Sequence, residues 1–401
     1  MLHILDLVLL ALLALTLLPP ALLFVVELCL GQTLPTTRVG ASRQAGCVVL
    51  MPAKNEAAVI GRTLARLQPC LGPQDHVLVV ADDCSDDTAA IARSRGAEVL
   101  ERPASDRRGK GFTLDYGVQH LRDALPETVV VLDADSWLTE DSLDRLVARS
   151  QQTGRPVQSL YLMQATPAGG LKQTVSAFAW KTKNQIRAAG LARLGGGVQL
   201  QGSGMAFPGV LLERFSFASG NIVEDLELGL ALAETGQACL FEPQAVTLSL
   251  FPENTEGTES QRTRWIHGHL GIIATLPKRI FGALARQQWR FALLALDAAV
   301  PPTLLWVMIL LATTGAAGLF ALLSGETATL RLSASCLVAS LAALTLTYLT
   351  HGRQMLPPRQ LLDVAGLLLA RLHVFPSFFS KRQTRWVVTR RDDEPDDPER
   401  R

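Results

Sequence analysis

The chain has 401 residues, of which 48% are hydrophobic and 19% are charged. This balance is too apolar for an ordinary soluble enzyme and too charged for a pure membrane bundle, so we expect a membrane part and a globular part. The formal net charge of +1 argues against nucleic acid as a main partner, because no basic surplus is left to coat a phosphate backbone. Six scattered cysteines without a CxxC pair favour free thiols in a reducing compartment over a zinc site.

The N-terminal region, residues 1–32, is expected to be a transmembrane helix. Leu7 to Val26 form a run of 20 uncharged residues, long enough to cross the hydrocarbon layer despite Pro19 and Pro20. A cleaved signal peptide is the alternative, but no Lys or Arg precedes the run and no small-residue cleavage pattern follows it. The basic residues come after the span: Arg38, Arg43, Lys54 and Arg62. The positive-inside rule therefore puts the next domain in the cytoplasm, at the inner (plasma) membrane.

Residues 45–275 have the composition of a soluble domain. Strand-like runs at Cys47 to Met51, His76 to Val80 and Thr128 to Leu132 alternate with helical stretches at Ala57 to Leu67 and Thr88 to Arg95. Alternation of this kind predicts βαβ units and a mostly parallel sheet. The expected fold is therefore an α/β domain with a single core.

The C-terminal region is expected to return to the membrane. Residues 276–350 read as an interfacial segment followed by a transmembrane hairpin of two uncharged runs, Ala298 to Gly325 and Leu332 to Thr350. Residues 351–389 hold an interfacial or re-entrant helix at 361–379 and a basic cytoplasmic segment. The charged, proline-containing tail, residues 390–401, is expected to be disordered. These segments predict a multi-pass membrane protein.

Two carboxylates follow the third strand-like run. Asp133 and Asp135 stand at i and i+2, and on an extended strand they share one face. Hard oxygen ligands at the carboxyl end of a strand can hold Mg²⁺ or Mn²⁺ and leave positions for water and a diphosphate. A solvated turn of acidic residues is an equally simple explanation of so short a pattern. The other motifs of the sequence are needed to distinguish a metal site from a solvated turn.

Polar residues also follow the first two strand-like runs. The first run ends at Ala53, and Asn55 and Glu56 come directly after it. The second is followed by Asp82, the candidate for contacting a nucleotide base or ribose. Simple helix capping is the alternative for Asn55, and for Asp86 and Asp87 further along. Because parallel strands deliver their carboxyl ends to one edge, the three groups are expected to meet there.

Taken in order, these strings resemble the nucleotide-binding half of family 2 glycosyltransferases of the GT-A fold, a Rossmann-like α/β fold. The resemblance covers Cys47 to Gly268, and the order and spacing of the strings are more specific than any one of them. The matching strings are PAKNE, VVADDCSDDT, RGKGFTLDYG, VVLDADSWL, QGSGMAF, VEDLELGL and QRTRW.

The resemblance assigns roles to the donor side of the site. It implies that Asp133 and Asp135 bind the metal, Mg²⁺ or Mn²⁺, and that Asp133 also contacts the diphosphate. It implies nucleoside contacts for Glu56 and Asp82, and Ala53 is expected among the substrate-binding residues. Lys110 would contact the diphosphate, with Gly109 and Gly111 letting its loop approach the phosphates, although a flexible surface turn explains GKG equally well. Ala81 and Asp83 depart from the residues common in the family, which puts the nucleoside contacts in doubt.

The acceptor side follows from the later motifs. The resemblance makes Asp225 the general base, with Glu224 beside it in the substrate site; the alternative is a pair of acids favoured by the dipole of the helix expected from Leu226 to Ala233. Gln261, Arg264 and Trp265 share one helical face and would bind the diphosphate and a sugar ring. An interfacial Trp beside a snorkelling Arg is the alternative there.

The implied function is an inverting transfer of sugar from a nucleotide-diphosphate sugar, expected to be a UDP-sugar, to a polysaccharide or lipid-linked acceptor, giving a β-linkage. One alternative is a processive synthase that extrudes its polymer. About three expected spans are few for a channel, unless subunits pool their helices in a homo-oligomer or export partners supply them. The other alternative is a non-catalytic, sugar-nucleotide-binding scaffold among the membrane lipids.

Overall fold

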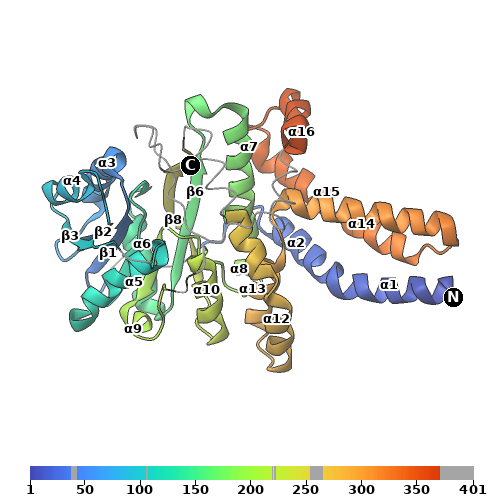
Figure 1. Cartoon of the computed structure of the whole chain (residues 1–401), viewed down its shortest axis with the longest axis horizontal. Coiled ribbons are helices and arrows are strands. Elements are labelled where there is room, and N and C mark those ends of the chain that lie inside the picture. Colours follow the sequence, from blue (N-terminus) through green and yellow to red (C-terminus); the bar gives the residue numbers. More distant parts are fainter. Residues whose placement is uncertain (38–42, 105–106, 219, 221–222, 253–264, 371–401) are drawn as a thin grey trace. The chain divides into compact units, whose positions relative to one another are not determined.

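The structure is a computed structural model that describes the chain except for residues 38–42, 105–106, 219, 221–222, 253–264 and 371–401 (Figure 1). It divides into two compact units. Among the described residues, the first comprises Met1–Pro35, Phe178–Gly197 and residues 269–370, and the second comprises those of Thr36–Ala177 and Val198–Gly268. The second unit holds the sheet.

Eight strands form one sheet in the order β3-β2-β1-β4-β7-β6-β8-β5. Six of them run in the same direction, because β1, β2, β3 and β4 pair in parallel, β6 and β8 pair in parallel, and β7 lies antiparallel to both β4 and β6. β5 is antiparallel to β8. The expected mostly parallel α/β fold is confirmed. The bounds are β1 Cys47–Ala53, β2 His76–Asp82, β3 Glu98–Arg102, β4 Thr128–Val131, β5 Ser136–Leu138, β6 Val157–Gln164, β7 Met205–Pro208 and β8 Leu240–Leu250.

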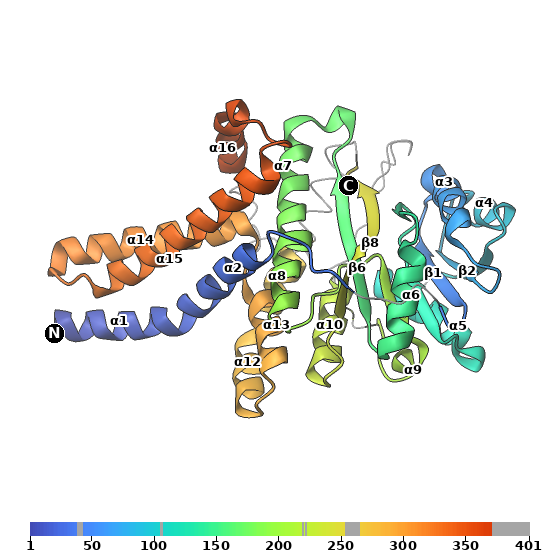
Figure 2. The same ribbon diagram turned by 180° about the vertical axis from the view of Figure 1, so that it is seen from behind.

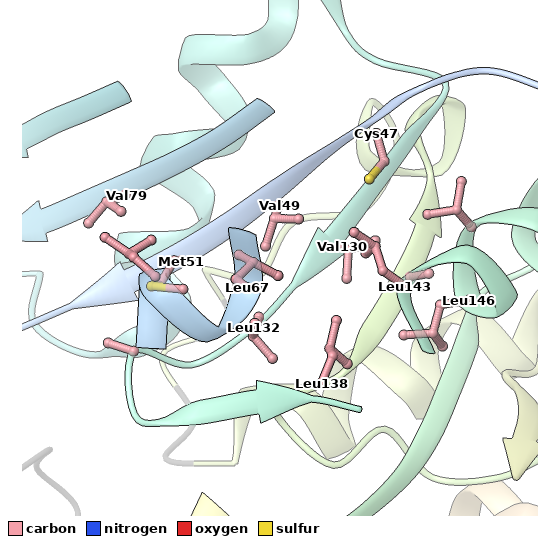
Figure 3. Packing of buried hydrophobic residues seen from close by; sticks show 14 of the residues in the cluster. Cys47, Val49, Met51, Leu67, Val79, Val130, Leu132, Leu138, Leu143 and Leu146 are labelled. Carbon is pink, nitrogen blue, oxygen red and sulfur yellow. The ribbon is translucent and has the colours of Figure 1, made fainter. Parts of the chain in front are cut away.

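Helices cover both faces of this sheet. Their bounds are α3 Ala57–Leu67, α4 Thr88–Ser94, α5 Lys110–Leu121, α6 Ser142–Thr153, α9 Gly209–Leu212 and α10 Glu224–Glu234, while α7 Gly170–Lys181 crosses from one unit into the other. On one face, Val49 and Met51 of β1 pack with Val130 of β4 against Leu67 of α3 and Leu143 of α6 (Figure 3). Side chains alternate along a strand, so Leu50 points to the opposite face.

On the opposite face of the sheet, helix α5 packs closely against β1 and β2. A Cβ atom placed on Gly117 would lie 2.5 Å from Leu50 Cδ1 and 2.9 Å from Val80 Cγ2. Any side chain at this position would push α5 away from β1 and β2. Gly117 therefore fixes how closely α5 packs on the sheet, and with it where Lys110, the first residue of the helix, is placed.

The other unit is helical. Its helices are α1 Leu2–Thr16, α2 Leu18–Leu30, α8 Ala188–Arg193, α12 Leu276–Ala285, α13 Trp289–Ala299, α14 Thr303–Ser324, α15 Ala328–Thr347 and α16 Leu361–Ala370. In its interior Arg187 Nε donates to Glu27 Oε2 at 2.8 Å, and the same guanidinium pairs with Asp297. Helices α14 and α15 lie side by side (Figure 2). Thr303–Ser324 and Ala328–Gly352 are long and apolar enough to cross a membrane.

The N-terminal helix differs from the expectation of one continuous span over Leu7 to Val26. The structure has two helices, α1 and α2, bent by 41° at their break, and the pair passes the length and hydropathy test for a membrane span only together. Pro19 and Pro20 occupy the first turn of α2. Proline lacks an N–H and disfavours helix in the residue before it, which explains the break at this position.

Two C-terminal expectations fall partly or wholly outside the described residues. Of the interfacial segment 361–379, the structure describes α16, which ends at Ala370. The tail 390–401 lies outside the described residues altogether.

Candidate active site

The parallel register brings three strand ends to one edge of the sheet. Ala53 at the end of β1 pairs with Ala81 of β2, and Leu50 pairs with Val131 at the end of β4. The residues that follow these ends are therefore neighbours, as the alternation of strands and helices predicted. Ala53 itself is buried, and its carbonyl oxygen accepts from Cys84 Sγ at 3.5 Å.

Polar residues after β1 and β2 bind one another. Asn55 has a φ of 52° and is not the helix cap. Its Oδ1 accepts from Ser85 N at 2.9 Å and its Nδ2 donates to Ser85 Oγ at 3.1 Å, while Glu56 occupies the capping position of α3. Asp86 accepts from Ala57 N at 3.0 Å and from Thr88 N at 3.1 Å, the first residues of α3 and α4, whereas the N-cap position of α4 is Asp87.

Asp82 is buried and bound within the chain. Its Oδ1 pairs with the Arg102 guanidinium, and its Oδ2 accepts from Thr113 Oγ1 at 3.0 Å. Asp82 and Arg102 are direct neighbours in the pairing of β2 with β3. The structure therefore gives this carboxylate a structural role beside the nucleoside contact expected of it.

A second group of charges surrounds Lys110. Its Nζ donates to Gly202 O at 2.9 Å and pairs with Asp133 Oδ1. The side chains of Lys110 and Asp133 are 21% and 25% exposed, so the pair is reachable from solvent. A Cβ atom placed on Gly202 would lie 3.3 Å from Asp225 Oδ2 and 3.4 Å from Lys110 Nζ. The turn at Gly202 thus lies against both the expected diphosphate contact and the expected base.

The first turn of α10 supplies the other acids. Helix α10 begins at Glu224, two residues before the predicted start, so Glu224 and Asp225 belong to the helix itself. Gly111 faces this turn, because a Cβ atom there would lie 2.4 Å from Phe217 O and 3.2 Å from Glu224 Cβ. A side chain at Gly111 would therefore collide with this part of the chain, and the close approach of the loop to phosphate stays a prediction.

The carboxylates of this group perturb one another. Burial of Lys110 opposes its charge, but Asp133, Glu224 and Asp225 outweigh burial and raise its pKa. Burial, together with Asp135 and Asp225, raises the pKa of Asp133 against the opposing effect of Lys110. Burial and the neighbouring Asp225 raise the pKa of Glu224 to about 7. The site therefore holds more negative charge than Lys110 neutralises.

This surplus suits a cation. Within the part of the chain that the structure describes, no three His, Cys, Asp or Glu side chains group as a complete metal site. Asp133 and Asp135 offer carboxylate oxygens at the sheet edge, and Mg²⁺ is commonly bound by one or two carboxylates together with water and substrate phosphates. The donor set fits a divalent ion whose shell the diphosphate completes.

Other expected residues lie outside this group. Gln261 and Arg264 fall outside the described residues, and Trp265 is partly buried and helical. Sequence reasoning missed Arg102, Thr113, Ser203 and Gln158, whose buried side chains bind candidate site residues or the turn at Gly202. The string QGSGMAF marked that turn, but no signal in the sequence pointed to Gln158.

A family model described as glycosyltransferase like family 2 matches residues 45–268. The match covers more than half of the chain. The chain belongs to glycosyltransferase family 2. The expected resemblance over Cys47 to Gly268 is confirmed, and the sheet described above carries the family 2 domain.

Relatives of this family 2 chain cover it to different extents. "Probable glycosyltransferase YdaM" of Bacillus subtilis (strain 168) is 23% identical over 248 residues, which is 58% of this chain and 57% of that protein. The 4,4'-diaponeurosporenoate glycosyltransferase of Staphylococcus aureus (strain MRSA252) is 32% identical over 108 residues, 26% of this chain and 28% of that protein. The chain thus spans little more than half of the first relative and under a third of the second.

A solved structure supports the GT-A fold. The mannosyltransferase PcManGT from Pyrobaculum calidifontis, in complex with GDP-Man and Mn²⁺, has a TM-score of 0.56 at 18% identity. The similarity covers 94% of this chain and 99% of that one. At this identity the similarity shows the fold of the family 2 chain and leaves its substrates to be proposed.

Proposed function

We propose that this family 2 chain is a membrane-bound inverting glycosyltransferase that uses a nucleotide-diphosphate sugar. The observation that carries the proposal is the meeting of Lys110, Asp133, Glu224 and Asp225 around the turn at Gly202. A single cation among several carboxylates at the carboxyl edge of a parallel sheet suits a diphosphate with its metal on one side and a base on the other.

The chemistry assigned to these residues is one displacement. Asp225 removes the proton from an acceptor hydroxyl, whose oxygen attacks the anomeric carbon of the donor. The bond from that carbon to the diphosphate oxygen breaks, and the nucleoside diphosphate leaves with the bonding electrons. Lys110 lies where it can stabilise the charge of that leaving group. Inversion of an α-linked donor gives a β-linked product.

A divalent ion, Mg²⁺ or Mn²⁺, is assigned to Asp133 and Asp135, and when bound it would neutralise diphosphate charge. Glu56 and Asp82 are assigned to the nucleoside, and Ala53 is assigned to substrate binding. Gln261, Arg264 and Trp265 are assigned to the diphosphate and a sugar ring, on the family resemblance alone. Uridine is the proposed base.

The acceptor is proposed to be a polysaccharide or a lipid-linked saccharide at the inner face of the plasma membrane. Helices α14 and α15 support a membrane location because they are long and apolar enough to span a bilayer. The basic residues that precede the sheet support a cytoplasmic site.

The test is a turnover and binding screen with the full chain in lipid nanodiscs. We expect hydrolysis or transfer with one class of nucleotide sugar in the presence of Mg²⁺ or Mn²⁺, lost on chelation. Asp135→Ala should lose the metal-dependent part of donor binding measured by calorimetry. Binding of a nucleotide sugar without any turnover would favour the scaffold alternative, and a ladder of long products would favour the processive one. Binding of no nucleotide sugar with either metal would refute the proposal.

A further inference from the structure

A buried glutamine of the sheet holds the turn against which the charged group lies. Gln158 of β6 is fully buried, and its Oε1 accepts from Gln201 N at 2.9 Å. Its Nε2 donates to Ser203 O at 2.9 Å and to Ser159 O at 3.1 Å. One side-chain amide thus binds both ends of Gln201–Ser203, and the alternation of donor and acceptor fixes which way round the amide lies.

The residues of that turn reach the candidate site directly. Gly202 O accepts from Lys110 Nζ at 2.9 Å, and Ser203 Oγ accepts from Asp133 N at 3.0 Å. Gly204 N donates to Val131 O at 2.9 Å, which ties the turn to the end of β4. Each of these contacts comes from a different residue of the turn, so a shift of its backbone would move Lys110 and Asp133 together.

We propose that Gln158 is a positioning residue for the transfer reaction. Its amide sets the backbone of Gln201–Ser203, and that backbone sets the place of the Lys110 ammonium relative to Asp133. The inference rests on the roles proposed above for Lys110 and Asp133. A displacement of about 1 Å in such a group can lower a rate by about 100-fold.

The chain offers a matched control. Gln151 of α6 also accepts from one backbone amide, Gln44 N at 2.8 Å, and donates to one backbone carbonyl, Ala45 O at 3.1 Å. Those residues precede β1 and lie at the opposite end of that strand from the candidate site. Gln151→Met therefore removes one hydrogen bond from a backbone amide and one to a backbone carbonyl, at a partly buried side chain, without touching the turn at Gly202.

The experiment compares kcat of the two variants in nanodiscs, each measured well below its own Tm. We expect Gln158→Met to lower kcat by about 100-fold and Gln151→Met to leave it within about twofold of the wild type. Gln158→Met is then combined with Lys110→Met. If Gln158 acts through Lys110, adding Gln158→Met to the Lys110→Met variant should lower kcat by only about a further threefold.

The inference would be overturned if Gln158→Met alone lowered kcat by less than about tenfold. It would also be overturned if Gln158→Met lowered kcat by as large a factor in the Lys110→Met variant as in the wild type. If Gln158→Met does not fold, Gln158→Asn replaces it under the same criteria, because an amide shortened by one methylene cannot keep both its bond to Gln201 N and its bond to Ser203 O. Full activity of Lys110→Met alone would refute the role proposed for Lys110, and that result is distinguishable from an active Gln158→Met beside an inactive Lys110→Met.

Discussion

Two groups of acidic side chains lie at the carboxyl edge of the sheet, and they differ in how far basic side chains neutralise their negative charge. In the first group, after β1 and β2, two carboxylates have basic partners: Asp82 pairs with Arg102, and Asp83 pairs with Lys54 at 2.9 Å. In the second group Asp133, Glu224 and Asp225 all act on one ammonium, that of Lys110. Balanced charge stabilises a fold, whereas surplus negative charge leaves capacity to bind a cation and to accept a proton.

The largest expected effect comes from removing the proposed base in the second group. Asp225→Asn keeps the size of the side chain and loses its basicity, so kcat should fall by about 10²- to 10⁴-fold while donor binding is retained. Transfer of labelled sugar and calorimetry of donor binding measure the two quantities. Glu227→Gln is the control, because it removes one charge from the first turn of the same helix. Undiminished activity of Asp225→Asn would refute the assignment of the base.

The first group should respond in stability. Asp82→Asn leaves the buried Arg102 without its anionic partner, a change that costs about 3–5 kcal/mol in buried ion pairs. Asp83→Asn breaks a pair in which the Asp83 side chain is 49% exposed, and the expected cost is below about 1 kcal/mol. Thermal unfolding of both variants without ligand tests the difference. Equal losses in Tm would mean that the Asp82 pair is no more stabilising than a surface pair.

Glu224 should behave in the opposite way, because the site makes its ionised form unfavourable. Its pKa is raised from an ordinary 4.5 to about 7, so the folded state binds a proton that the unfolded chain has released. The contribution of Glu224 to the free energy of unfolding is therefore most favourable below pH 4.5, and it declines as the pH rises to 7. Above pH 7, the raised pKa of Glu224 corresponds to a loss of about 3 kcal/mol in the free energy of unfolding.

Glu224→Gln removes this penalty. In the presence of a chelator its Tm should exceed that of the wild type at pH 8, by roughly 5–10 °C, and the gain should vanish towards pH 4.5. Differential scanning fluorimetry across this pH range measures it. A gain that is independent of pH would show that the carboxylate is not the cause.

The sequence was sufficient for the elements that depend on local pattern. The helix expected at Ala57 to Leu67 has those bounds in the structure. The three strand-like runs are β1 and β2, each two residues longer than expected, and β4, one residue shorter. Apolar runs between turn residues contain this information directly. The placing of Asp82 and Asp133 at one edge followed because parallel strands share their direction.

What the sequence could not provide is which side chains meet across the fold. Arg102 reaches Asp82 because β3 pairs with β2 in one register, and Gln158 reaches the turn at Gly202 because β6 lies next to β7. No local pattern encodes either register. The bend between α1 and α2 was indicated by Pro19 and Pro20, and the apolar length of the segment outweighed that signal in the prediction of one straight span.

The smallest expected effect concerns the residue that joins the turn to the sheet. Gly204 has a φ of +66°, and a Cβ atom on it would lie 2.0 Å from Thr247 Oγ1 and 2.1 Å from Ser159 Oγ. Gly236 has a similar φ of +86° but no neighbouring atom within 4 Å of such a Cβ. Both Gly→Ala variants carry the cost of a left-handed conformation, about 1 kcal/mol, and only Gly204→Ala adds overpacking, about 1–3 kcal/mol. The difference in Tm between the two variants measures how rigidly the sheet holds the turn. Equal losses of Tm would mean that the turn moves aside, so that Lys110 and Asp133 are less firmly placed than the hydrogen bonds imply.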